Sequence, residues 1–468
     1  MELNRANRSR LIILTTLLLL LSGCSTTNPY HFIGWQEHNC SNPDSSDCRQ
    51  SYYQEYPGYD LAFVEYTERG NTFNDAWKDE VVAKIAEREK AQGVVTLVFI
   101  HGWKHNADED NKNLKKFKKT LEELTESAQL LGRRLVGVYI GWRGLSVTIP
   151  LLKELSFWDR KAVAQEVGKG GVTNLLLDLE KIDRNRSDNV LLIVGHSFGG
   201  AIAVSATSEI ISEILINDRQ QEDPGGSVGD AVIVLNPAIE ANQSLSMVEA
   251  ALQNGPTAPR NPLFYSISTD ADRATHYAFP IGQTLGLFFS WRQTDLERAN
   301  YYDRITNEKL MLREEHLDST TIGNFAPYLT HRLSMDDSGG IPNARLHSCE
   351  EDADACVPKG LTTLEGHPAL GPLPAHYPLQ FIKTDKSIME DHNDIFNPRI
   401  LTFIYTLIDD IVRYTVREDP KYEDDGIATG NILSRPDDLN RRFRQFYDNI
   451  EMKLSETPAT GTKPKASQ

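Results

Sequence analysis

The sequence feature that most constrains the fold is an apolar run that leads directly into a serine flanked by glycines. Residues Val190–Gly200 read VLLIVGHSFGG, and an apolar stretch with helical spacing continues to Leu215. A continuous run of Val, Leu and Ile predicts a strand buried on both faces, as in a parallel sheet. The Gly-x-Ser-x-Gly spacing predicts a sharp turn into a helix, with Ser197 at its tip. Ser197 is therefore the first candidate functional residue, and a purely structural glycine turn is the alternative.

Strands and helices alternate along most of the chain. Apolar runs predict strands at 61–66, 94–100, 135–140, 190–194, 231–235, 263–268 and 379–383. Helical spacing of apolar residues predicts helices at 77–89, 111–131, 158–182, 198–215 and 400–414, with a final amphipathic helix at 439–450. This alternation predicts an α/β fold with a mainly parallel sheet and helices on both of its faces.

A second signal for the same site lies upstream. Residues Phe99–Trp103 read FIHGW, so a predicted buried strand ends in a His-Gly pair. A tetrahedral oxyanion is stabilised by N–H donors that are fixed in place before the reaction. The N–H of Phe198, directly after the serine, and the N–H of Trp103 are the candidate donors. The alternative is that His101 and Gly102 only close a turn.

Several motifs together resemble a group of bacterial α/β-hydrolases whose substrates are poorly defined. They are GHSFGG at 195–200, GWRG at 141–144, SFWDRKAVAQEVG at 156–168, DRAT at 272–275 and HNDI at 392–395. The resemblance covers residues 60–415 apart from one irregular stretch. It implies the α/β-hydrolase fold and catalytic residues in the order Ser, Asp, His, with Ser197 as nucleophile, Asp272 as acid and His392 as base.

The residues themselves leave alternatives for the acid and the base. The sequence STDAD at 268–272 offers two carboxylates beyond a strand; Asp272 matches the family stretch, whereas Asp270 lies nearer the strand end. Of the histidines that follow, His392 alone lies between the last predicted strand and the last core helix, at an edge where open α/β sheets bind ligands. His331 is the alternative base. The acid's task is to hold the histidine tautomer and stabilise the imidazolium.

The remaining segments divide the chain around this core. Residues 59–274 and 375–454 are predicted to form the core, the latter with the C-terminal helix, and 455–468 form a polar, disordered tail. Residues 275–374 are rich in Pro, Gly, His and charge and lack regular spacing, which predicts a lid-like insertion before the last strand. An apolar cluster in this insertion is expected either to contact an acyl chain or to pack on the core: Phe279, Leu285, Leu287, Phe288, Phe289 and Trp291.

The first 23 residues have the composition of a signal peptide. Three arginines precede the apolar run Leu11–Leu21, which is too short to span a bilayer comfortably. The run ends in LSGC, which resembles the lipobox of bacterial lipoproteins. The resemblance implies that Cys24 receives diacylglycerol and becomes the acylated N-terminus, followed by a linker and irregular segment at 24–58. A Ser instead of Asp after this cysteine favours the outer membrane, and an ordinary signal peptide with a chance cysteine is the alternative.

The other four cysteines form two local pairs in polar stretches. Cys40 lies near Cys48, and Cys349 lies near Cys356. Because export leads to an oxidising compartment, these pairs favour two disulfides that each close a small loop. Zinc binding is the alternative, but neither spacing matches a zinc knuckle and no histidine is arranged beside them.

Charge and nucleophile type narrow the function. The chain has 49 basic and 66 acidic side chains, a net charge of −17, which disfavours binding to nucleic acid or to anionic lipid heads. A serine nucleophile favours ester cleavage through an acyl-enzyme, with no metal or organic cofactor. We therefore expect an esterase or lipase-like hydrolase of small-molecule or lipid esters, anchored in the bacterial envelope at the outer membrane facing the periplasm. A non-catalytic envelope lipoprotein that binds through the same fold, a peptidase and an acyltransferase are the alternatives.

Overall fold

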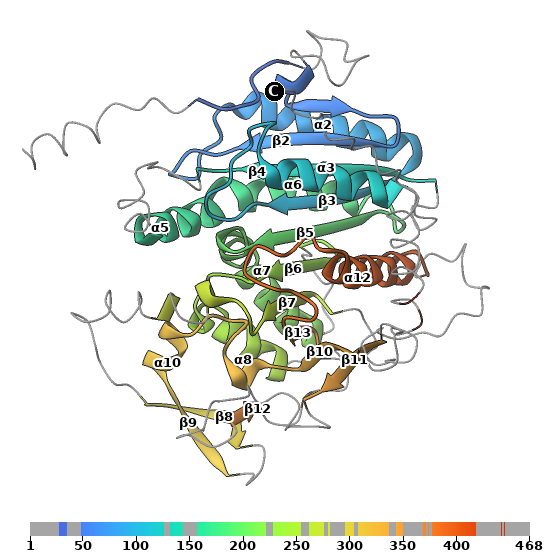
Figure 1. The fold of residues 1–468 in the computed structure, drawn as a ribbon. Helices are drawn as coiled ribbons and strands as arrows, with labels where there is room; N and C mark the ends of the chain where they lie inside the picture. The colour runs from blue at the N-terminus through green and yellow to red at the C-terminus, as the bar shows by residue number, and fades with distance from the viewer. Residues whose placement is uncertain are drawn as a thin grey trace, which may run out of the picture.

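The structure is a computed structural model that describes residues 28–34, 48–125, 132–143, 157–220, 228–253, 262–275, 279–280, 295–303, 308–336, 343–349, 368–370, 373, 377–417, 441 and 444. Within these ranges a ten-stranded sheet has the order β1-β2-β4-β3-β5-β6-β7-β13-β10-β11. Its strands from β2 to β10 run parallel, whereas β1 and β11 pair antiparallel at the two edges. The expected α/β fold with a mainly parallel sheet is confirmed (Figure 1).

The bounds of the elements are as follows. The main sheet contains β1 (Tyr53–Glu55), β2 (Tyr59–Glu65), β3 (Val94–Ile100), β4 (Arg134–Gly141), β5 (Val190–His196), β6 (Ala231–Leu235), β7 (Phe264–Thr269), β10 (His331–Asp336), β11 (Asn343–Ser348) and β13 (Leu379–Thr384). A smaller antiparallel sheet contains β8 (Asp295–Asp303), β9 (Lys309–Arg313) and β12 (Pro368–Leu370). The helices are α2 (Asp75–Gln92), α3 (Lys112–Thr125), α5 (Phe157–Val167), α6 (Thr173–Asp183), α7 (Phe198–Gln220), α8 (Leu245–Gln253), α10 (Glu314–Ser319) and α12 (Pro398–Arg417).

Helices cover both faces of the main sheet. The apolar side chains of α2, α5, α6, α7 and α8 form one buried cluster with alternate strand residues, and those of α3 and α12 form a second cluster on the opposite face. Along β3, Val98 and Ile100 belong to the first cluster, whereas Leu97 and Phe99 belong to the second. The central strands read as unbroken apolar runs because each of their faces is covered in this way.

Helix α7 lies at the centre of the first layer. Its segment Phe198–Asn217 is long and apolar enough to cross a membrane, but 67% of the most apolar window is buried inside the fold. It packs on β5, α5 and α8. Burial between these elements accounts for its apolar composition, as expected for the core helix of an α/β layer.

The segment predicted to be an irregular insertion differs most from expectation. Strands β10 and β11 from this segment extend the main sheet, and β10 pairs in parallel with β13, His331 lying opposite Ile382. The strand at 379–384 is therefore an interior strand of the sheet. The sequences of β10 and β11 are HRLSMD and NARLHS, in which polar residues outnumber apolar ones. In β10, Leu333 is buried in the second apolar cluster. Strands near a sheet edge need less apolar surface, which is why periodicity alone missed them.

The long helix expected at 158–182 is broken in the middle. Helix α5 ends at Val167, a π-helical turn covers Gly168–Val172, and α6 begins at Thr173. Within the turn Gly170 has non-helical dihedral angles of φ −103° and ψ −115°. A Cβ on Gly171 would lie 2.4 Å from the ring of Tyr66, so close packing against the end of β2 requires the glycine. Helix α8 was also missed by the sequence patterns.

Several expectations concern residues outside the described ranges. These are the signal peptide, Cys24, Cys40, Cys356, the C-terminal tail, the final helix apart from residues 441 and 444, and the apolar cluster at 285–291. Phe279, the described member of that cluster, is fully buried in the first core cluster. Its position agrees with the alternative in which the cluster packs on the core.

Candidate active site

The candidate active site begins at the turn from β5 into α7. Ser197 has a φ of 58°, in the left-handed region that residues other than glycine rarely adopt. The turn is crowded: a Cβ on Gly199 would lie 2.0 Å from the carbonyl oxygen of Ile100, and one on Gly195 would lie 2.5 Å from that of Gly199. The backbone N–H of Ser197 donates to Leu235 in β6 over 3.0 Å. This strained turn is the geometry that the Gly-x-Ser-x-Gly spacing predicts.

Two side chains from distant parts of the chain meet at Ser197. His392, in the loop between β13 and α12, lies with Nε2 2.8 Å from Ser197 Oγ. Asp272, shortly after β7, lies with Oδ2 2.7 Å from His392 Nδ1. The three residues follow the carboxyl ends of parallel strands, which meet at one edge of the sheet. The structure thus brings together the residues predicted as nucleophile, acid and base.

Asp272 is completely buried and accepts from four donors. Oδ1 accepts the backbone N–H groups of Ala274 (2.8 Å) and Thr275 (3.1 Å), and Oδ2 accepts the Thr275 hydroxyl (2.6 Å) and His392 Nδ1. Burial raises the pKa of Asp272, but these donors, His392 first among them, outweigh burial and hold the pKa below its usual value. An ionised Asp272 keeps the proton of neutral His392 on Nδ1, so that Nε2 accepts the Ser197 hydroxyl.

The alternative acid and base lie elsewhere. Asp270 forms ion pairs with Arg332 (2.7 Å) and Lys383 (3.5 Å). His331 is on β10 with Nδ1 3.0 Å from the hydroxyl of Thr330, and burial lowers its pKa to about 4. The geometry therefore favours Asp272 over Asp270 and His392 over His331.

The loop that carries His392 is held to the turn at Ser197 through the His392 carbonyl oxygen. His196 Nε2 donates to the His392 carbonyl over 2.8 Å, and Asn236 Nδ2 donates to the same oxygen over 3.1 Å. Burial lowers the pKa of His196 to about 3, so its ring is neutral and carries its proton on Nε2. Asn236 also accepts the Thr269 N–H over 3.0 Å, which joins β6, β7 and this loop. Sequence patterns gave no signal for either residue, since His196 occupies an unconstrained position of the serine motif.

The loop after β3 lies directly against the serine. A Cβ on Gly102 would be 3.0 Å from Ser197 Cβ, so the backbone of this loop approaches Ser197 closely. The ring of Trp103 packs edge-on against that of Phe198, with 6.4 Å between centroids. Phe198 is the first residue of α7, where helix N–H groups point toward the turn. The two candidate oxyanion donors thus belong to segments that both adjoin Ser197, and their role stays a prediction.

His101 braces this loop from below. It is fully buried, its Nδ1 donates to Gly102 O over 2.9 Å, and its Nε2 accepts the Trp142 N–H over 3.2 Å. The Trp142 indole in turn donates to His101 O over 2.8 Å. Burial lowers the pKa of His101 to about 3, which keeps the ring neutral. These contacts give His101 a structural role in holding the loop of Gly102 and Trp103 against Ser197.

The described cysteines are both oxidised. Cys48 and Cys349 are disulfide-bonded. Cys48 opens the turn before β1, and the N–H of Cys349, just after β11, donates to Thr330 over 2.8 Å. The predicted partners, Cys40 and Cys356, lie outside the described residues, so the pairing stays a prediction.

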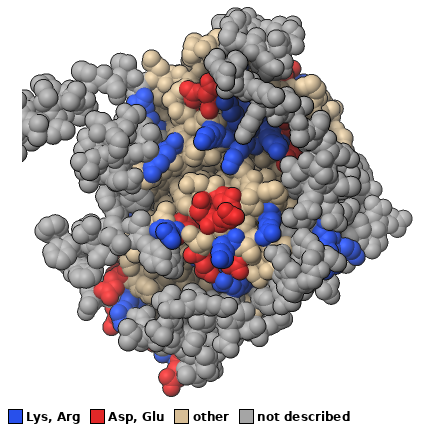
Figure 2. All heavy atoms as spheres, in the orientation of Figure 1, with Lys and Arg blue, Asp and Glu red and all other residues tan. Residues whose placement is uncertain are grey.

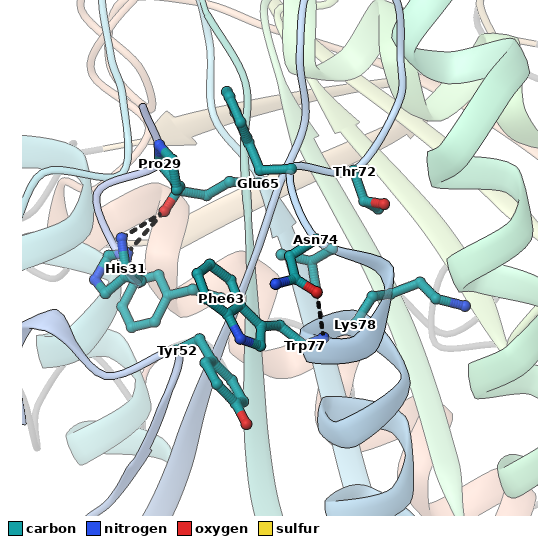
Figure 3. A pocket seen from close by; sticks show the side chains of 11 residues that line it. Pro29, His31, Tyr52, Phe63, Glu65, Thr72, Asn74, Trp77 and Lys78 are labelled. Atoms are coloured by element: carbon teal, nitrogen blue, oxygen red, sulfur yellow. Dashed lines mark hydrogen bonds and ion pairs between the residues drawn. The ribbon is translucent and has the colours of Figure 1, made fainter. Parts of the chain in front are cut away.

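A small pocket lies at the carboxyl end of β2, beside the start of α2 (Figure 3). His31, Phe63 and Trp77 line it, and its polar groups are used within the protein: Asn74 caps α2 by accepting the Trp77 N–H over 3.3 Å. Glu65 accepts both the backbone N–H (2.8 Å) and Nδ1 (3.1 Å) of His31. The pocket therefore marks where the N-terminal segment joins the core, and we assign it no ligand.

Two further features of the described residues concern metal binding and surface charge. In the described ranges no group of three or more His, Cys, Asp or Glu side chains is arranged to hold a metal ion. Figure 2 shows acidic and basic side chains in separate small groups on the coloured part of its face. Helix α3 alone carries five lysines, and three of them pair with the acids Asp110, Glu109 and Glu123. On α3, acidic neighbours therefore balance part of the positive charge.

Comparison with models of protein families, with curated proteins and with solved structures found no match for this chain.

Proposed function

We propose that this protein is a serine hydrolase of the α/β-hydrolase type, which cleaves carboxylic esters through an acyl-enzyme on Ser197. The observation that carries the proposal is the hydrogen-bonded series from Asp272 through His392 to Ser197, with distances of 2.7 and 2.8 Å. The positive φ of Ser197 and its place between β5 and α7 support it, because both are features of a nucleophile at a strand-to-helix turn.

The reaction follows from the proton positions. His392 Nε2 takes the proton of Ser197 as Oγ attacks the ester carbonyl, and buried Asp272 stabilises the imidazolium that forms. The N–H groups of Phe198 and Trp103 are proposed to bind the oxyanion. His392 then gives the proton to the departing alcohol. Water, activated by the same histidine, releases the acid and restores Ser197.

Carboxylic esters are the proposed substrates because their alcohol leaves more readily than the amine of an amide. Three catalytic residues and two N–H donors are then sufficient for ester cleavage, because His392 can carry out every proton transfer. Small-molecule and lipid esters both fit this chemistry. A peptidase or acyltransferase would use the same three residues and is separated from an esterase by assay.

We further propose that Cys24 carries a lipid anchor and that the protein lies at the outer membrane facing the periplasm. The LSGC sequence after the apolar run supports the anchor. The first described residues after it are held to the core: the N–H groups of Tyr30 and His31 both donate to Glu65 at the end of β2. The anchor would therefore join the fold through a short tether, since Asn28 follows Cys24 by four residues.

A substrate panel tests the proposal. Turnover of p-nitrophenyl esters of increasing acyl length is compared with turnover of a thioester and a peptide anilide, using the parent, Ser197→Ala and Ser212→Ala. Ser212 is the matched control because its hydroxyl donates to Ser208 within α7 over 2.7 Å. We expect ester turnover that is lost in Ser197→Ala and kept in Ser212→Ala. Ester hydrolysis that persists in Ser197→Ala, or a preference for the anilide, would contradict the proposal. A parent protein that turns over none of these substrates would favour the alternative of a non-catalytic lipoprotein that binds through the same fold.

A further inference from the structure

A buried lysine lies behind the triad, on the strand that precedes His392. Lys383 is 2% exposed and forms an ion pair with Asp270 over 3.5 Å. Its ammonium also donates to the carbonyl oxygen of Gly323 over 3.4 Å and to Oδ1 of Asn324. A buried ammonium requires such partners because removing its charge from water is costly. An ammonium has donors only, so every group it bonds must present an acceptor.

This restriction sets the direction of a series of hydrogen bonds. Because Oδ1 of Asn324 faces Lys383, its amide nitrogen must face the other way, and Nδ2 donates to the Thr275 hydroxyl over 3.1 Å. The Thr275 oxygen, already accepting, directs its proton to Oδ2 of Asp272 over 2.6 Å. Asp272 is then an acceptor on this side and receives His392 Nδ1 on the same oxygen.

We propose that Lys383 is a positioning residue that acts through Asn324 and Thr275 to keep Asp272 an acceptor and so to hold His392 in the tautomer that activates Ser197. The proposal rests on the proposed serine-hydrolase function and adds to it three residues that act through Asp272. Asn324 belongs to the stretch between α10 and β10. The segment expected to be a lid therefore contributes a support for the catalytic acid.

The charged groups around Lys383 and around His392, the two ends of this hydrogen-bond series, agree with the positioning role. Lys383 faces Asp270, Asp272 and Arg332; burial lowers the pKa of the lysine, and the two carboxylates oppose that effect. His392 faces Asp272, His196 and His105. His196 and His105 both have lowered pKa values, chiefly through burial, and add no positive charge beside the base near neutral pH. Variants that remove the charge of Lys383 or add a charge at Asn324 should therefore make the surroundings of His392 more negative.

The test uses the rate at which a fluorophosphonate probe labels Ser197, measured against pH. This rate depends on His392 as a base but needs no knowledge of the natural ester. Lys383→Met removes the ammonium, which carries a positive charge and can only donate hydrogen bonds. Asn324→Asp keeps the size of the side chain but replaces the amide NH2 donor by an acceptor oxygen. We expect both to lower the labelling rate about tenfold or more. Both should also move the acid limb of the profile to higher pH, because the added net negative charge favours the imidazolium.

A second pair of variants keeps the charge constant. Thr275→Val removes the hydroxyl donor and should slow labelling, whereas Thr275→Ser keeps the hydroxyl and should restore most of the rate. The matched control is Thr406→Val in α12, where a fully buried hydroxyl donates to Thr402 over 2.8 Å. That variant should lose stability without changing the labelling rate of the folded protein.

The outcomes separate this inference from the function on which it rests. Labelling that survives Ser197→Ala would overturn the serine-hydrolase function and the positioning role together. Ser197-specific labelling with unchanged rates and profiles in Asn324→Asp and Thr275→Val would overturn the positioning role alone. If Lys383→Met does not fold, Asn324→Asp decides the matter, since it retains the size of the side chain and the acceptor for Lys383.

Discussion

Replacing Asp272 by asparagine changes one atom in the buried site and should remove most of the activity. The amide offers one acceptor oxygen where the carboxylate offers two, and four donors compete for them. The N–H groups of Ala274 and Thr275 hold the oxygen on their side, so the new NH2 group faces His392. The histidine must then accept at Nδ1 and carry its proton on Nε2, directed at Ser197, where it cannot act as a base.

The expected cost follows from this reversed tautomer. A wrong tautomer lowers turnover about ten-thousandfold in triad hydrolases. At 1.36 kcal/mol for each factor of ten, this corresponds to roughly 5.5 kcal/mol of lost transition-state stabilisation. Asp270→Asn is the matched control, because Asp270 pairs with Arg332 and Lys383 and its side chain is 28% exposed. We expect it to change turnover by less than about tenfold.

The assay is the initial rate with a soluble p-nitrophenyl ester, with thermal unfolding of each variant recorded beside it. A folded Asp272→Asn variant with nearly full activity would refute the assignment of the acid. The reverse order, a severe loss in Asp270→Asn and a mild loss in Asp272→Asn, would move the acid to Asp270.

Three further predictions concern the rest of the chain. Glu65 and Glu109 flank buried His31 at 3.1 and 3.5 Å; burial lowers the pKa of His31, but the two carboxylates outweigh it and raise the pKa above its usual value. A raised pKa in the folded state stabilises the protein below about pH 6.5, and this contribution is lost as pH rises through the folded pKa. His31→Gln should therefore destabilise the protein by roughly 1–3 kcal/mol at pH 5.5 and by less at pH 9, and equal losses in thermal unfolding at both pH values would contradict this. Cys24→Ala should release the protein from membranes or leave it unprocessed, whereas palmitate labelling that persists in the variant would exclude Cys24 as the acylated residue. Peptide mapping without reductant should find Cys48 linked to Cys40 and Cys349 linked to Cys356, and other partners for the two oxidised residues would disprove the pairing.

The sequence was most informative where both faces of an element are buried. The runs at 94–100, 190–196 and 231–235 are continuous because helices cover each side, and their strands lie within a residue or two of the expected bounds. Periodicity failed for β10 and β11, whose polar residues lie near the sheet edge. It also failed at the π-helical turn, although the glycines at 168, 170 and 171 were a visible signal of a break.

The candidate site likewise contains residues that local sequence patterns indicate and residues that they do not. Ser197 follows from local spacing, because the strand-to-helix turn that holds it is built from adjacent residues. His392 and Asp272 were selected by chain order and by resemblance, and the structure brings them to Ser197. Asn324 and Lys383 gave no signal, since their contacts join segments about 60 residues apart that no local pattern relates. Long-range polar contacts of this kind depend on the register of β13 beside β10 and β7.

The central claim, that Ser197 forms an acyl-enzyme with help from His392, is tested most directly by trapping that intermediate. An aryl carbamate leaves a carbamoyl group that hydrolyses slowly, so its attachment site can be identified by peptide mass spectrometry. We predict one carbamoyl group on the peptide that contains Ser197, absent in Ser197→Ala and formed far more slowly in His392→Ala. Modification of a different residue, or equal modification of the parent and Ser197→Ala, would contradict the account.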